Sequence, residues 1–231
     1  MEGYMSDIDY DDQKTWRLFK DGRTKGVFQL ESNLGKSWSK KLAPSNLEEL
    51  AALIALIRPG CLKAIADGKS MTQHYVDRKS KKDKVVYFHE SLEDILKPTY
   101  GVLVYQEQSM RIAQKLAGFD LQEADKLRKA IGKKKADLMA KVKEDFLVGC
   151  ETVAVVDHAT AQEVFSWIEK SSRYSFNKSH AVAYAMNSYC QLGIKLIIPK
   201  NFFCPIFFTR QINKIHIKKF MNCCRKPNYS I

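Results

Sequence analysis

The sequence predicts a mainly α-helical fold with minor β structure. Apolar residues recur at three- and four-residue spacing in several long segments, as on the buried face of a helix, and residues that favour helix starts precede most of these segments. Runs of β-branched and aromatic residues are short and few. The chain has 231 residues, 45% of them hydrophobic, so it can form a sizeable core and disorder is not expected.

The first predicted helix contains TWRLF and follows a cluster of aspartates. The cluster consists of Asp7, Asp9, Asp11 and Asp12. Paired carboxylates can hold two metal ions for phosphoryl transfer, but aspartates at this position more often cap a helix. We therefore predict a helix cap here and no metal site.

The next helices start at Ser or Asp residues that can cap them. Each cap is followed three positions later by an acid that can return a hydrogen bond to the first turn. The predicted pairs are Ser45 with Glu48, Ser91 with Asp94, and Asp120 with Glu123. The first of these helices, NLEELAALIALI, is expected to end at Arg58, because the residue before a proline avoids helical angles and a glycine follows.

Three helices are predicted in the second half of the chain, over residues 121–132, 136–150 and 159–170. Gly132 is expected to end the first. The residues expected to be buried by their spacing are Leu121, Ala124, Leu127 and Ile131 in the first helix, and Leu138, Val142 and Phe146 in the second.

Extended segments are predicted where β-branched and aromatic residues cluster between glycine, proline or charged residues. These segments are GVFQL at 26–30, KVVYF at 84–88 and YGVLVY at 100–105. They account for the minor β structure that we expect.

The charge of the chain points to a polyanionic partner such as nucleic acid. Lysine and arginine number 38 against 26 acids, which gives a net charge of +12 and a pI near 9.3. The run RKSKKDK at 78–84 is either a phosphate contact or a solvated loop. A denser cluster would suit a triphosphate, and it comprises Arg128, Lys129, Lys133, Lys134 and Lys135.

The stretch YSFNKSH, residues 174–180, is polar and basic and leads into an apolar run. A helix that begins near Asn177 would place N–H groups and a positive dipole end beside Lys178 and His180, where an anion could bind. Tyr174 could stack on a base or a sugar. Taken alone, the stretch also fits a capped helix with incidental basic residues.

Several common protein classes lack their signatures in this sequence. It contains no GxxxxGK[ST], GxGxxG, HExxH or GxSxG motif. The six cysteines include no CxxC pair, which predicts reduced thiols and no zinc site. The N-terminus does not resemble a secretion signal, and no stretch reaches the ~20 apolar residues of a membrane span. We expect a soluble, cytoplasmic protein.

Five motifs together carry a resemblance to a known family. They are GVFQLES (26–32), ALIRPG (55–60), TYGVLVYQEQ (99–108), AGFDLQEADKLRKAIGKKK (117–135) and YSFNKSHAVAYA (174–185). In content and order they resemble the fingers region of the bacterial replicative DNA polymerase III alpha subunit, the C family of DNA polymerases. The resemblance covers about residues 10 to 210.

The resemblance implies a helical fingers domain that closes over the incoming dNTP and steers the template base and primer end. It implies that residues 1–25 end a connection from the palm and that 26–210 form the fingers. The expected dNTP contacts are Arg128, Lys129, Lys133, Tyr174, Asn177, Lys178 and His180. The expected contacts to template-primer DNA are Arg58, Arg78, Lys79, Lys134 and Lys135.

Two residues depart from the family pattern. Ser175 stands where the family usually has glycine, and Cys61 stands where a second proline usually follows RPG. Ser175 would restrict the turn if that position requires a positive φ angle.

The resemblance also implies that the chain is a fragment. In the complete enzyme, Mg²⁺ would be bound by aspartates of a palm outside this chain, so none of these residues is expected to be catalytic or to bind metal. The isolated chain is not expected to extend a primer. The sliding clamp and other replisome subunits would be partners of the full-length protein, and no membrane is expected to be one.

Residues 211–231 have lost the acid balance and the periodicity of the preceding chain. A shifted reading frame near residue 210 would explain this, and the alternative is a divergent, disordered basic tail.

For the whole chain, the alternative to a polymerase part is a non-catalytic nucleic-acid-binding remnant that lacks the palm carboxylates. A helix-turn-helix regulator fits the charge but does not explain YSFNKSH beside LRKAIGKK.

Overall fold

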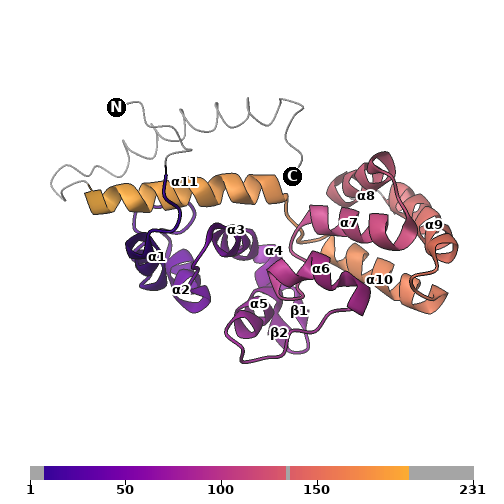
Figure 1. Ribbon diagram of the computed structural model, residues 1–231, viewed down its shortest axis with the longest axis horizontal. Helices are drawn as coiled ribbons and strands as arrows, with labels where there is room; N and C mark the ends of the chain where they lie inside the picture. The colour runs from indigo at the N-terminus through magenta and orange to yellow at the C-terminus, as the bar shows by residue number, and fades with distance from the viewer. Residues whose placement is uncertain (1–7, 134–135, 198–231) are drawn as a thin grey trace. The chain divides into compact units, whose positions relative to one another are not determined.

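The computed structural model describes residues 8–133 and 136–197, and it confirms a mainly helical fold with minor β structure (Figure 1). The chain divides into two compact units. Among the described residues, 8–57 combine with 179–197 in one unit, and those between Arg58 and Lys178 form the other. None of the described helices has the length and apolar character needed to cross a membrane.

The described part of the unit that contains the N-terminal residues has helices joined by turns and irregular segments, and no strand. The helices are α1 (Gln13–Lys20), α2 (Asn33–Leu42), α3 (Leu47–Leu56) and all but the first residue of α11 (Lys178–Ile197). Asp12 caps α1 by accepting hydrogen bonds from the N–H groups of Lys14 and Thr15, which confirms the predicted cap. Trp16 is fully buried and its ring lies 4.7 Å from that of Tyr189 on α11.

The cap of α3 lies one residue later than predicted. Asn46 accepts a hydrogen bond from the Glu49 N–H at 2.9 Å, and the Glu49 carboxylate accepts one from the Ser45 N–H at 2.8 Å. Glu49 thus returns its hydrogen bond to Ser45, the residue before the cap, and the predicted pair of Ser45 with Glu48 does not form. Asn46 is an equally good cap, and the shift lets Glu49 point its carboxylate back toward the chain before the helix.

The second unit is built around a helical bundle (Figure 1). In chain order its elements are α4 (Pro59–Lys63), β1 (Ile65–Ala66), β2 (Lys69–Ser70), α5 (Met71–Lys79), η2 (Glu90–Leu92), α6 (Glu93–Leu96), η3 (Lys97–Thr99), α7 (Gln106–Ala117), α8 (Leu121–Lys133), α9 (Ala136–Val153) and α10 (His158–Ser171). Helix α7 packs against α8 and α9, and α9 packs against α10. Their apolar faces form one buried cluster that includes Leu116, Leu127, Phe146 and Phe165.

The buried stripe of α8 begins later than predicted. Ala124, Leu127 and Ile131 are buried, but Leu121 is 75% exposed, because it is the first residue of the helix and lies beyond the packed turns. The helix continues past Gly132 to Lys133. On α9, Val142 and Phe146 are buried as expected, and Leu138 is partly buried against the same cluster.

Of the remaining predicted caps, one is confirmed and one is wrong. Asp120 and Glu123 exchange hydrogen bonds at 2.7 and 2.9 Å before α8. Ser91 does not cap a helix with Asp94, because it lies inside the short 3₁₀ turn η2, and the His89 side chain caps that turn instead.

The three predicted extended segments do not form strands. Residues 26–30 form turns, in which Leu30 donates to the Val27 carbonyl at 3.1 Å, and 84–88 are irregular. In 100–105, Tyr100 and Gly101 have positive φ angles, and only Tyr105 forms a bridge, to Phe176. Among the described residues, the two-residue strands β1 and β2 form the sheet. Several of these residues are buried, among them Val27, Leu103 and Val104, so they pack without a strand. What the segments lack, within the described residues, is a partner strand beyond the single bridge at Tyr105.

Candidate functional site

The loop of residues 174–178, which we call the tied loop, leads into α11 and is bound to the start of α7. Phe176 donates a hydrogen bond to the Val104 carbonyl at 3.0 Å, and the Phe176 carbonyl accepts one from the Gln106 N–H at 2.9 Å. These two bonds are the bridge between Tyr105 and Phe176. The tied loop therefore has its backbone fixed on both sides of Phe176.

The predicted helix start near Asn177 is confirmed, since α11 begins at Lys178. The carboxylate of Glu107, in the first turn of α7, accepts hydrogen bonds from both residues. Asn177 Nδ2 lies 2.9 Å from Glu107 Oε1, and the Lys178 backbone nitrogen lies 2.9 Å from Oε2. The anion-binding position predicted from YSFNKSH thus already holds a carboxylate of the chain itself.

Our sequence analysis did not name Glu107. A signal for it was available, because QEQ ends the motif TYGVLVYQEQ and the orphan N–H groups of a helix start need an acceptor. The neighbouring Gln108 caps α7 itself, and its Oε1 accepts from the N–H groups of Val104 and Tyr105 at 2.9 and 3.0 Å. The two residues therefore fix the starts of two different helices.

Arg58 holds the other side of the tied loop. Its Nη2 donates to the Tyr174 carbonyl at 2.8 Å, and its guanidinium lies 4.0 Å from the centre of the Phe176 ring. Burial lowers the pKa of Arg58, but an arginine this basic keeps its charge at neutral pH. The Arg58 charge is thus used at least in part within the unit.

The two departures from the family pattern fit the tied loop without strain. Cys61 is buried in α4, and its thiol lies 3.7 Å from the Tyr174 carbonyl that also accepts from Arg58. Ser175 does not have a positive φ angle, so the concern about its turn does not apply. Its hydroxyl is buried and has no hydrogen-bond partner among the described residues. A Cβ on Gly60 would lie 3.3 Å from Tyr174 Cβ, so this glycine allows α4 to approach the loop closely.

Tyr174 and His180 lie in different units. Burial raises the pKa of the Tyr174 phenol to about 12, so it stays protonated near neutral pH. His180 packs edge-on against Tyr184 on α11, with ring centres 4.3 Å apart. Burial lowers the pKa of His180 below its ordinary value of 6.5, so the imidazole is neutral at pH 7. It can donate a hydrogen bond to an anion but adds no full charge.

The motif GVFQLES supports α11 through Phe28. The Phe28 ring stacks on that of Tyr184 at 4.7 Å, and its backbone N–H donates to Gln191 Oε1 at 2.9 Å. The Phe28 carbonyl accepts from the Ser188 hydroxyl at 3.3 Å. This motif therefore positions the helix that carries His180.

On α8, Arg128 and Lys129 form what we call the cationic pair. Each contacts Asp125 on the preceding turn, with Arg128 Nη2 and Lys129 Nζ both 2.7 Å from a carboxylate oxygen. The side chains are 38% and 53% exposed, respectively, so an anion can reach them. Hydrogen bonds from Lys129 and then Arg128 lower the pKa of Asp125. The Lys133 side chain, Lys134 and Lys135 lie outside the described residues.

The cations of the run at 78–84 include one that points into the protein. Arg78, on α5, donates from Nη1 to the Tyr100 carbonyl at 3.2 Å, and burial lowers its pKa. Lys79 is the last residue of α5 and is half-buried. Arg78 thus supports the turn at Tyr100 and Gly101, whatever else it contacts.

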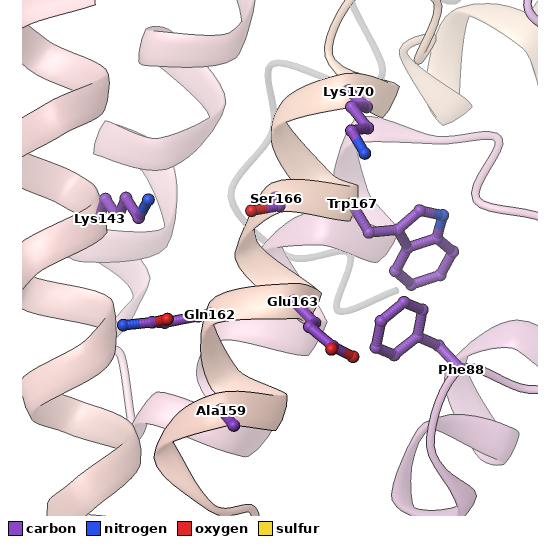
Figure 2. Close-up of a pocket in the computed structure, with 8 residues that line it drawn as sticks. All are labelled: Phe88, Lys143, Ala159, Gln162, Glu163, Ser166, Trp167 and Lys170. Atoms are coloured by element: carbon purple, nitrogen blue, oxygen red, sulfur yellow. The ribbon is translucent and has the colours of Figure 1, made fainter.

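A depression lined by residues of α9 and α10 and by Phe88 contains none of the predicted residues. Figure 2 shows the rings of Phe88 and Trp167 lying against each other there, with Lys143 and Lys170 also lining it. The ring centres are 5.2 Å apart and the ring planes differ by 17°. Sequence reasoning gave no signal for this surface, because Phe88 and Trp167 come from segments far apart in the chain.

No metal-binding cluster of three or more His, Cys, Asp or Glu residues occurs in the described parts of the chain. Asp12 is engaged as the cap of α1, and Asp9 accepts a hydrogen bond from the Asp11 N–H at 2.8 Å. Cys61, Cys150 and Cys190 are buried thiols. We therefore assign no step to a metal at these residues.

Comparison with known proteins places these features in a family. The family described as the bacterial DNA polymerase III alpha subunit finger domain matches residues 2–153. The DNA polymerase III subunit alpha of Aquifex aeolicus is 43% identical over 216 residues, which is 94% of this chain, and that of Bacillus subtilis is 43% identical over 219 residues, also 94% of the chain. The Escherichia coli K12 subunit is 41% identical over 229 residues and 97% of the chain. The chain spans 18–19% of the length of these relatives.

Proposed function

Because the chain belongs to the family of bacterial DNA polymerase III alpha subunit finger domains, we propose that it is part of a DNA-directed DNA polymerase and binds the incoming dNTP and the template-primer DNA. The observation that supports this most directly is the cationic pair. Arg128 and Lys129 project from consecutive positions of α8, are exposed, and are held beside each other by Asp125.

The cationic pair suits a triphosphate for chemical reasons. A guanidinium can form two parallel hydrogen bonds to phosphate oxygens, and an ammonium acts as a compact point charge beside it. Asp125 cancels one of the two charges while the phosphates are absent. A bound triphosphate would compete with Asp125 for the same N–H groups. Because it carries more negative charge, it would displace Asp125 from Arg128 and Lys129 in the closed, water-poor site of a polymerase. Lys133 would extend this contact.

The residues around the start of α11 would complete the nucleotide pocket. In this proposal Tyr174 packs on the base or the sugar, and Asn177, Lys178 and His180 supply polar contacts. The neutral His180 would donate a hydrogen bond without adding charge. The tied loop supports the proposal because a fixed backbone presents these groups at little entropic cost when the nucleotide binds.

Template-primer DNA would be contacted by basic residues on the same unit. The proposed contacts are Arg58, Arg78, Lys79, Lys134 and Lys135. Arg58 and Arg78 each donate to a backbone carbonyl, and their charged groups are only partly buried, so an internal role and a phosphate contact are compatible.

The chemistry of nucleotide transfer would come from outside this chain. Mg²⁺ would be held by carboxylates of the complete polymerase, and the sliding clamp and other replisome subunits would bind that complete protein in the cytoplasm. We propose that the isolated chain does not extend a primer. Magnesium-dependent primer extension by the purified chain would contradict this.

Substitutions in the complete polymerase test the nucleotide pocket. In both Lys129→Ala and His180→Ala, kcat/KM for dNTP incorporation is expected to fall about tenfold or more, because each removes a group that contacts the nucleotide. The Kd for primer-template DNA is expected to stay within about twofold of the unsubstituted enzyme, because neither residue is a proposed DNA contact.

Lys126→Ala is the matched control, because Lys126 is an exposed lysine of the same helix. Unchanged incorporation in both test variants would contradict the proposed pocket. Loss of DNA affinity with no effect on dNTP use would instead favour a nucleic-acid-binding role without polymerase chemistry.

A further inference from the structure

The first turns of two helices share one carboxylate. Glu107 lies in the first turn of α7, and its two oxygens accept one hydrogen bond each from Asn177 Nδ2 and the Lys178 N–H, both at 2.9 Å. Residues 107 and 177 are 70 positions apart in the sequence. This contact is therefore a tertiary feature and not part of either helix's local cap.

The carboxylate is the chemical group that both donors require. A carboxylate only accepts hydrogen bonds, so the amide of Asn177 must turn its NH₂ group toward Glu107 and its oxygen away. The positive end of the helix dipole at the start of α11, a helix of 20 residues, also favours a negative charge there. Glu107 consequently fixes the side-chain orientation of Asn177 and binds the backbone N–H of Lys178, the first residue of α11.

Glu107 itself is well placed to hold a fixed position. The preceding residue, Gln106, donates its N–H to the Phe176 carbonyl at 2.9 Å. The following residue, Gln108, donates from Nε2 to the Thr99 hydroxyl at 2.7 Å and caps α7 with its oxygen. Both neighbours are thus anchored, so the Glu107 backbone has little freedom to move.

We propose that Glu107 is a positioning residue for the nucleotide pocket, which acts on the substrate through Asn177 and Lys178. The proposal rests on the function proposed above. It assigns Glu107 no contact with the reacting atoms. Its effect is that the groups presented by Asn177 and Lys178 are already aligned before the dNTP arrives, so that less binding energy is lost in ordering them.

The test is Glu107→Gln in the complete polymerase. The substituted side chain keeps its size but has one acceptor oxygen and one NH₂ group. It can therefore accept from both donors only if they share one oxygen, and otherwise the Asn177 amide must turn its oxygen toward residue 107 and reverse the orientation seen here. We expect KM for dNTP to rise about five- to tenfold, as for loss of one ordinary hydrogen bond, with kcat and the Kd for DNA within about twofold. Hydrogen exchange at the Lys178 amide is expected to become faster.

Glu144→Gln is the matched control, because Glu144 is an exposed glutamate of α9 and the substitution removes the same charge. It is expected to leave KM for dNTP unchanged. Should E107Q fail to fold, E107D gives the second comparison, since it keeps the charge but is too short to reach both donors at once. E107D is expected to raise KM in the same direction.

Several outcomes would overturn the proposal. Faster exchange at Lys178 with an unchanged KM for dNTP would show that Glu107 supports the fold alone. A lower KM for dNTP in E107Q would show that the Glu107 charge repels the nucleotide. An equal change of KM in E144Q would show that the effect comes from the net charge of the protein and not from the position of Glu107. If K129A and H180A impair incorporation while E107Q does not, this inference alone fails. If none of the three does, the proposed pocket fails.

Discussion

The tied loop and the cationic pair are both polar parts of the same unit, but they are held in different ways. The tied loop is fixed by backbone hydrogen bonds to α7, by the Glu107 carboxylate and by the half-buried Arg58. Arg128 and Lys129 are exposed and contact a single surface carboxylate. Ion pairs of the second kind are weak and are screened by salt, whereas partly buried hydrogen bonds depend little on it.

In the function proposed above, this difference would give the two parts different tasks. The cationic pair would supply charge that can rearrange when phosphates bind, and the tied loop would supply a geometry that is present before binding. Basic residues that look equivalent in the sequence therefore make different kinds of contact in the structure. The Arg58 guanidinium donates to the Tyr174 carbonyl, and the Lys178 backbone N–H donates to the Glu107 carboxylate, while Arg128 and Lys129 expose their charged groups.

Arg58→Ala should have the largest effect on stability, because it breaks the tied loop. It removes a charged hydrogen bond to the Tyr174 carbonyl and the contact with the Phe176 ring, which together are worth roughly 2–3 kcal/mol of unfolding free energy. Urea unfolding of the chain measures this. Arg23→Ala is the control and should cost far less, because Arg23 is 73% exposed and its ion pair with Asp21 is long, at 3.8 Å. Equal losses in the two variants would mean that the loop is not held by Arg58.

Gly60→Ala tests how rigid the tied loop is. A methyl group here would meet Tyr174 Cβ at 3.3 Å, closer than ordinary contact, while alanine would otherwise favour the helix. If the loop cannot move, the substitution should destabilise the chain by about 0.5–1 kcal/mol, as mild overpacking does. Thermal unfolding distinguishes the cases, and a stabilised variant would show that the loop yields easily.

Asp125→Asn tests how the cationic pair is held. It removes the carboxylate that competes for Arg128 and Lys129, so KM for dNTP in the complete polymerase should fall about two- to fivefold, and less at high salt. Asp145→Asn, at an exposed aspartate of α9, is the control and should change KM little. A higher KM in D125N would mean that Asp125 aligns the two cations and does not compete for them.

The pH dependence of the same carboxylate should give the smallest effect. The pKa of Asp125 in the folded chain lies below its ordinary value of 3.8, so its ion pairs stabilise the chain above that pH. This contribution is lost as the pH falls through the lowered pKa. The difference in melting temperature between the unsubstituted chain and D125N should thus be small and constant from pH 7 to about pH 4, and vanish below that range. A difference that grows on acidification would contradict this sign.

Local features of this protein could be predicted from the sequence. The Asp12 cap, the reciprocal cap of Asp120 and Glu123, and the start of α11 next to Asn177 all depend on residues within one helical turn of each other. The buried stripe of α8 from Ala124 onward also follows from spacing alone. Helices are set by such neighbours because their hydrogen bonds join residues four positions apart.

The predicted strands were wrong because a strand depends on residues that are distant in the sequence. The segments 26–30, 84–88 and 100–105 have suitable residues, but a strand is defined by its partner, and the chain packs helices where those partners would be. The domain boundaries at residues 25 and 210 stay predictions. Residues 211–231, and with them the frameshift hypothesis, lie outside the described residues.

By itself the sequence determined that the chain is helical, which family it resembles, and which basic residues are candidates for an anion site. Only the tertiary structure decided how those candidates are used, because their partners are remote in the chain. Arg58 reaches Tyr174 across 116 positions, and Glu107 reaches Asn177 across 70. No local pattern specifies such a pair, since packing of the helical core brings the two segments together and the hydrogen bonds form only after that.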